Sequence, residues 1–143
     1  MPQNIELPSR SISFRPDLKV MVVRWHTHAQ LEVVQADYGH MLDAAVEAGV
    51  YDWLLDVRRR DKVTAELSGW VSQVFYPAAT QRVAPHRIRM AVLNSPALTE
   101  AYVSDPDQKK YVAYALDPAR PYDIGLFDDE GAAMRWLNPA VAS

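Results

Sequence analysis

The sequence predicts an α/β fold built on a single mixed, mostly parallel sheet with flanking helices. The chain has 143 residues, which is the usual size of one domain. Short runs rich in branched and aromatic residues alternate along it with longer segments of helical periodicity. Strands that alternate with helices are joined by parallel crossovers. Only the first two strands are separated by a tight turn, which predicts an N-terminal antiparallel hairpin.

The predicted hairpin consists of residues 11–15, which alternate polar and apolar, and residues 18–26, which are rich in valine and aromatic residues. Between them, Pro16 and Asp17 are typical of a turn, because proline presets φ for the first central position. Residues 1–10 contain two prolines and little periodicity, so we expect a loose N-terminal arm.

The central part of the chain predicts a helix, a buried strand and a second helical segment. Apolar residues recur at spacings of three and four over residues 31–48, and Gly49 is a natural stop. Residues 51–57 are apolar on both faces, which is typical of a strand inside a sheet. A helix follows Thr64, its expected N-cap. Pro77 interrupts this helix, so either the helix kinks there or a second short helix begins.

The last part of the chain continues the alternation, with strands at residues 87–93 and 122–127. Proline follows Ser95 and Asp105, a signal for helix starts, and predicts helices over residues 96–103 and 107–116. The second of these also fits an alternating strand pattern over residues 110–116. Asp128 is the expected cap of a final helix, with Phe127 packing on Ala132 as a hydrophobic staple. Residues 11–138 thus form one domain, and residues 139–143 a short tail.

Composition excludes several classes of function. The net charge of −3 argues against a nucleic-acid partner. The absence of cysteine excludes disulfides, thiolate metal sites and cysteine nucleophiles. Neither a signal peptide nor a run of about 20 apolar residues is visible. We therefore expect a cytoplasmic protein with no membrane span.

Three stretches of the chain resemble a known family. They are residues 51–56 (YDWLLD), residues 74–77 (VFYP) followed by residues 89–93 (RMAVL), and residues 127–137 (FDDEGAAMRWL). In this order, over residues 11–138, they are similar to the STAS-like, or SpoIIAA-like, family of small bacterial domains. The pattern is more distantly similar to the CRAL-TRIO fold.

The resemblance implies a regulatory, protein-binding role, because family members of known function act as such switches. Anti-sigma-factor antagonists of the family carry a phosphorylatable serine after the central strand. Here the equivalent turn, residues 58–64, reads RRRDKVT and lacks that motif.

This same turn is the candidate site. Asp56 ends the central strand, and open α/β sheets bind ligands outside the carboxyl ends of their strands. Three arginines follow, and the free N–H groups at the start of the next helix favour anions. The alternative is a solvated basic turn with internal ion pairs. The candidate binding residues are Asp56, Arg58, Arg59, Arg60, Asp61 and Thr64.

Other patterns in the sequence are weaker evidence for a functional site. His26 and His28 have metal-ligand spacing on a strand, but a site needs a third ligand, so we expect no metal. No phosphate loop, nucleophile elbow or Glu-x-x-His helix is present. The sequence therefore predicts a regulatory or protein-interaction domain without catalytic activity or cofactor. The alternative is a carrier of a small apolar or anionic ligand. The expected partner is another protein or a second copy of the chain.

Overall fold

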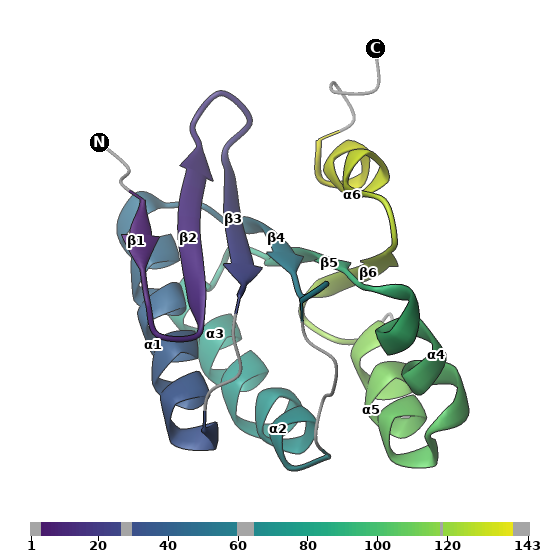
Figure 1. The fold of residues 1–143 in the computed structure, drawn as a ribbon. Helices are drawn as coiled ribbons and strands as arrows, with labels where there is room; N and C mark the ends of the chain where they lie inside the picture. Colours follow the sequence, from purple (N-terminus) through teal and green to yellow (C-terminus); the bar gives the residue numbers. More distant parts are fainter. Residues whose placement is uncertain (1–3, 27–29, 60–64, 118, 139–143) are drawn as a thin grey trace.

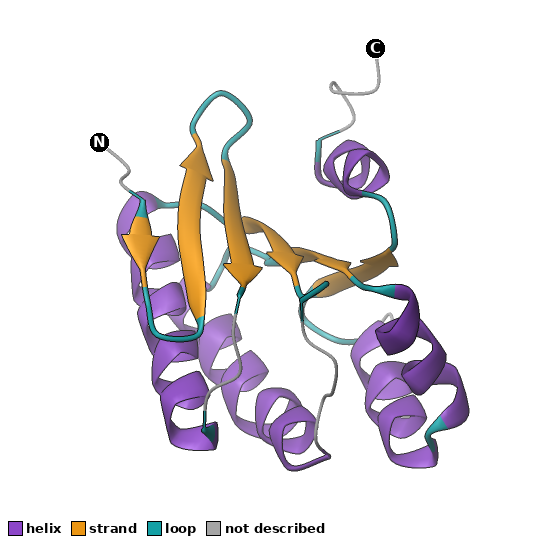
Figure 2. Cartoon of the chain, viewed as in Figure 1, coloured by secondary structure: helices purple, strands orange, loops and turns teal. Residues whose placement is uncertain are grey.

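The fold is a six-stranded mixed sheet whose strands lie in chain order. The computed structural model describes residues 4–26, 30–59, 65–117 and 119–138. Strands β1 (Ile5–Glu6), β2 (Arg10–Arg15) and β3 (Val20–Trp25) pair antiparallel. Strands β4 (Asp52–Asp56), β5 (Arg89–Leu93) and β6 (Asp123–Phe127) continue the sheet parallel to β3 (Figure 2). The predicted fold class, including the N-terminal hairpin, is confirmed.

The helices are distributed unequally over the two faces of the sheet. Helix α1 (Leu31–Ala48) joins β3 to β4, and α4 (Pro96–Ser104) with α5 (Pro106–Leu116) joins β5 to β6. Figure 1 shows these helices on one side of the sheet and the last helix, α6 (Glu130–Leu137), on the other. Residues 107–116 are thus helical. No helix within the described ranges combines the length and apolar character needed to cross a bilayer.

Alternation along the strands builds two cores. Trp53 and Leu55 point into the larger core beneath α1 and the β4–β5 crossover, whereas Leu54 points into the smaller core beneath α6. Both faces of β4 are therefore buried, as its apolar run predicted. The smaller core is formed by Val20, Val22, Leu54, Ala91, Leu93, Ala133, Met134 and Leu137.

The segment containing Pro77 is one helical run with an irregular turn. Helix α2 (Ala65–Trp70) passes into the π-helical turn η1 (Val71–Phe75) and then into α3 (Tyr76–Val83). Proline inside a regular α-helix lacks its N–H donor and collides with the carbonyl four residues earlier. The wider π turn, in which the Tyr76 N–H bonds to the Val71 carbonyl, ends at Phe75, two residues before the proline, and accommodates it. The sequence left open a kinked helix or a second short helix, and the structure shows a continuous helical run with one wider turn.

The expectation of a loose arm over residues 1–10 is wrong for residues 5–10. Ile5 and Glu6 form β1 and pair with β2, and Arg10 is the first residue of β2. Ser9 and Arg10 are fully buried. A two-residue strand has no periodicity to detect, and the partners that fix this segment lie far away in the chain.

Those partners are a carboxylate on α1 and two aromatic rings. Asp37 accepts hydrogen bonds from the backbone N–H of Ser9 at 2.8 Å and from its hydroxyl at 2.6 Å. The Arg10 guanidinium lies 4.0 Å from the ring centroid of Trp25 and 4.2 Å from that of Tyr38. Such cation–π contacts stabilise a buried cation.

The start of α6 is one residue later than predicted. Asp129, not Asp128, caps the helix, and its Oδ2 accepts a hydrogen bond from the Ala132 N–H at 2.8 Å. The shift moves Phe127 out of staple register with Ala132. Its ring instead packs on Trp136, with 5.7 Å between centroids.

Candidate functional site

A row of polar residues crosses the sheet at the carboxyl ends of β3 and β4. Strand register pairs Glu6 with Ser11, Ser11 with Arg24, and Arg24 with Asp56, so these side chains share one face of the sheet. This is the face that carries α6, which packs over β4, β5 and β6. Over β2 the same face is polar, with Ser11, Ser13 and Arg15 alternating along the strand.

Asp56 is the centre of the charged part of the row. Its Oδ1 accepts hydrogen bonds from the backbone N–H of Arg58 at 3.1 Å and from Nε of Arg58 at 3.0 Å. Its Oδ2 accepts from Nη2 of Arg58 at 2.9 Å and from Nη1 of Arg24 at 2.7 Å. Four donors occupy the lone-pair positions that a carboxylate offers. Asp56 is therefore saturated.

The saturation determines its protonation state. Burial alone would raise the pKa of Asp56, but the hydrogen bonds from Arg58 and Arg24 outweigh it and hold the pKa below the ordinary carboxyl value. Asp56 is thus an ionised structural anchor. It has neither a free lone pair nor a suitable pKa for taking up a proton at neutral pH.

Arg24 connects the sheet to α6. Its Nη1 also donates to Oε1 of Glu130, the first residue of α6, at 2.8 Å. The second arginine, Arg58, has Nη2 at 3.6 Å from the same oxygen. Both bonds of Arg24 leave from Nη1, so its Nε–H and Nη2–H groups have no hydrogen bond to the part of the chain that the structure describes.

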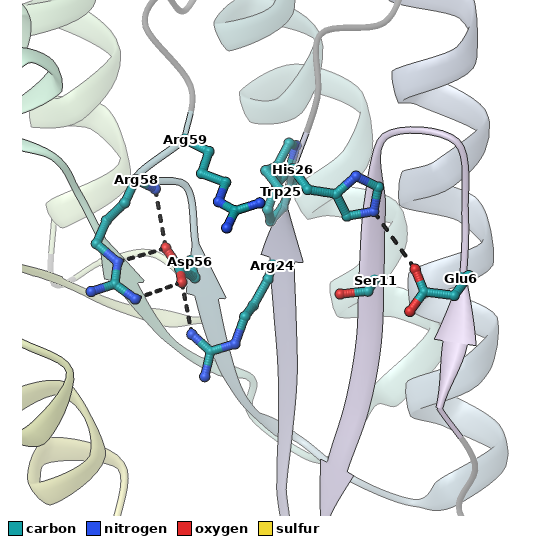
Figure 3. Close-up of a pocket in the computed structure, with 8 residues that line it drawn as sticks. All are labelled: Glu6, Ser11, Arg24, Trp25, His26, Asp56, Arg58 and Arg59. Carbon is teal, nitrogen blue, oxygen red and sulfur yellow. Dashed lines mark hydrogen bonds and ion pairs between the residues drawn. The ribbon is translucent and has the colours of Figure 1, made fainter.

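A half-open pocket of about 740 Å³ lies beside this cluster (Figure 3). In Figure 3, Arg59 extends from the turn after β4 toward β3, the Ser11 side chain lies on β2, and the Arg24 side chain bends from β3 toward Asp56. Among the described residues, neither the Arg59 guanidinium nor the Ser11 hydroxyl has a hydrogen-bond partner or ion pair. The pocket is lined by Glu6, Ser11, Arg24, Trp25, His26, Asp56, Arg58 and Arg59.

His26 and Glu6 close the other end of the pocket. Nε2 of His26 lies 3.7 Å from Oε2 of Glu6, too long for a hydrogen bond but within the range of an ion pair when the imidazole is protonated. His28, the other half of the spacing seen in the sequence, lies outside the described residues. Within the described ranges, no three histidine, aspartate or glutamate side chains are grouped as metal ligands are.

Half of the predicted site residues meet in this pocket. Asp56, Arg58 and Arg59 line it, whereas Arg60, Asp61 and Thr64 lie outside the described residues. The interpretation of the arginines changes in one respect. Arg58 is bound to Asp56, so the guanidinium N–H groups without a partner among the described residues belong to Arg59 and Arg24. Arg24 was missed, although it could have been recognised as a polar residue at the carboxyl end of the strand beside β4.

Comparison of the chain with protein-family models, with curated proteins and with solved structures finds no significant match.

Proposed function

We propose that this chain is a non-catalytic interaction domain that binds an acidic group of a protein partner in the pocket between Arg24 and Arg59. One observation carries the proposal: two arginines whose guanidinium groups keep donors without a partner in the described part of the chain line the same half-open pocket. Guanidinium donors are suited to carboxylate and phosphate oxygens, and such charge-assisted hydrogen bonds are among the stronger ones in proteins.

The balance of charge supports an acidic partner. Among the described residues at this end of the pocket, Arg24, Arg58 and Arg59 stand against Asp56 and Glu130, which leaves one positive charge. The negative charge of Glu6 lies at the other end, beside His26. An anion that enters between Arg24 and Arg59 therefore meets uncompensated positive charge.

The chemistry of the pocket supports binding rather than catalysis. Asp56, the most buried acid in it, is saturated and its pKa is lowered. Within the described residues, His26 makes no side-chain hydrogen bond to Ser11, so no nucleophile and base are paired. A regulatory role also agrees with the resemblance of the chain to STAS-like domains. We propose it as a member of that class.

A matched pair of variants tests the proposal. The probe is a capped acidic peptide, acetyl-Gly-Asp-Glu-Glu-Asp-Gly-amide, titrated into the full chain and followed by NMR. We expect Arg59→Gln to weaken binding by about tenfold, equivalent to about 1.4 kcal/mol. Arg15→Gln is the control, because Arg15 lies at the far end of β2 and pairs with Asp17. It makes the same change in net charge, and we expect less than about a twofold effect.

Two results would contradict the proposal. One is the absence of binding by the wild-type chain at low salt. The other is an equal loss in both variants, which would assign the binding to net charge rather than to the pocket. Wild-type binding should also weaken as salt is added, because partly exposed charges are screened.

The pocket volume also favours a second candidate, a carrier of a small anionic molecule. About 740 Å³ lies within the range of small-molecule sites. Native mass spectrometry of the purified chain separates the two candidates. A retained small-molecule mass that Arg59→Gln abolishes supports the carrier, whereas a bare chain that binds the peptide supports the interaction domain.

A further inference from the structure

We infer that the acidic group suited to this pocket is a phosphate monoester rather than a carboxylate. The inference rests on the proposed function and makes its ligand more specific. It starts from the number of donors that face the pocket and from the elements that supply them.

A carboxylate accepts fewer hydrogen bonds than the pocket can donate. Its two oxygens lie in one plane and offer about four lone-pair positions. Asp56 shows this limit, because Arg58 and Arg24 together fill its positions. Arg59, Arg24 and Ser11 together offer more N–H and O–H donors than a second carboxylate can accept.

Within the described part of the chain, the donors that have no partner come from three separate elements. Arg24 on β3 offers Nε–H and Nη2–H, Ser11 on β2 offers a hydroxyl, and Arg59 on the turn after β4 offers its guanidinium. A phosphate monoester presents three strongly accepting oxygens that are not in one plane, with a charge of about −1.5 to −2 at neutral pH. These oxygens point in different directions and therefore suit donors that come from separate elements.

Ser11 is the residue that separates the two chemistries. It faces Arg24 directly across the β2–β3 ladder, and its side chain shares the pocket with both arginines. A hydroxyl adds little to a carboxylate already held in a guanidinium fork. It does supply a donor to the third oxygen of a phosphate. The volume of about 740 Å³ leaves room for the group to which the phosphate is attached.

The test compares three capped peptides that differ only in the central side chain. They are acetyl-Gly-phosphoserine-Gly-amide, acetyl-Gly-Glu-Gly-amide and acetyl-Gly-Ser-Gly-amide, titrated into the full chain at constant ionic strength. At pH about 7.5 the phosphate is almost fully dianionic. We expect the phosphopeptide to bind about tenfold more tightly than the glutamate peptide, and the serine peptide not to bind.

The variant Ser11→Ala distinguishes a phosphate site from a carboxylate site, and Ser13→Ala is its control. Ser13 lies two residues from Ser11 on the same strand and the same face, and it does not line the pocket. We expect Ser11→Ala to weaken phosphopeptide binding by about three- to tenfold and to leave glutamate binding unchanged. Ser13→Ala should change neither.

The outcomes separate this inference from the proposed function. Equal affinity for the phosphopeptide and the glutamate peptide overturns the phosphate inference and leaves the proposed function in place. No binding of either peptide overturns both. Glycerol 3-phosphate, titrated in parallel, identifies the source of the phosphate. Affinity equal to that of the phosphopeptide indicates a small phosphorylated molecule, and weaker affinity indicates a phosphorylated protein segment.

Discussion

Asp52 and Asp56 lie four residues apart on β4 and face the same side of the sheet, yet their environments act on them in opposite directions. Burial raises the pKa of Asp52, and the nearby charge of Arg89 only partly opposes this effect. In Asp56, burial is outweighed by the hydrogen bonds of Arg58 and Arg24, and the pKa is lowered. The position of a carboxyl on a strand therefore does not determine its ionisation; the donors around it do.

This difference predicts opposite effects of the same substitution. Asp56→Asn should lower the free energy of unfolding by about 2–3 kcal/mol, because it removes the charged acceptor of two arginines at a buried position. Asp52→Asn should raise it by roughly a few tenths of a kcal/mol, because burial disfavours the charge that is removed. Urea denaturation at pH 7 measures both. Equal losses would show that the hydrogen bonds to Asp56 do not stabilise the fold.

At the scale of single residues, the sequence indicated the residues of the candidate site that are close together in the chain and missed those that are far apart in it. Asp56, Arg58 and Arg59 are close in the chain, so a buried strand end followed by arginines was enough to associate them. Arg24 and Glu130 are 106 residues apart, and Arg24 is 32 residues from Asp56. Contacts of that kind depend on strand register and on where α6 begins, which no local pattern encodes.

At the scale of elements, arginines hold α6 on the sheet at both ends. Helices this short are not stable alone in water. Arg24 on β3 bonds the first residue of α6, and Arg89 on β5 donates to the carbonyls of Trp136 at 2.8 Å and Leu137 at 3.0 Å. The guanidinium of Arg89 also lies 4.5 Å from the ring centroid of Trp136. Such contacts satisfy carbonyls that the end of a helix leaves unpaired.

Removal of the C-terminal cap should loosen α6 selectively. We expect Arg89→Met, which keeps an apolar stem, to lower the free energy of unfolding by about 1–2 kcal/mol. It should also accelerate amide hydrogen exchange in α6 more than in α1. Arg87→Met is the control, because Arg87 is exposed and pairs with Asp123. Uniform acceleration in both helices would mean that Arg89 stabilises the whole fold rather than α6.

The elements that the sequence predicted have a local pattern of their own. Helix α1 has an apolar repeat and strands β2 to β6 have an alternation or an apolar run, and their positions are confirmed within two residues. Strand β1 has two residues and no period, so it was missed. The π turn before Pro77 was not foreseen because a helical pattern does not register one extra residue within a turn.

At the scale of the whole molecule, the sheet is covered on one face and only half covered on the other. The helices of the three crossovers bury one face, and α6 covers the parallel half of the other face. The uncovered half lies over β2, where Ser11, Ser13 and Arg15 alternate with apolar residues. The pocket opens where the covered and uncovered halves meet.

The same arrangement makes the stability of the molecule depend on acid. Hydrogen bonds from arginines hold the pKa of Asp17 and Asp123 below the ordinary carboxyl value, and in Asp56 they do so against burial. Burial raises the pKa of Asp52. A carboxyl with a lowered native pKa stabilises the fold at pH values above its unfolded pKa of about 3.9. That contribution is lost as the pH falls through the native pKa. A raised pKa acts in the opposite direction.

Among the described residues, three carboxyls have a lowered pKa and one has a raised pKa, which predicts that the free energy of unfolding falls between pH 5 and pH 3. Urea denaturation at both pH values measures the change in wild type and in Asp56→Asn. The variant starts lower but should lose less on acidification, because it lacks the buried carboxylate that must be protonated. If the variant loses as much as wild type, Asp56 is not a source of the acid sensitivity. If wild type is equally stable at both pH values, the arginine-bound carboxylates together contribute nothing to the fold.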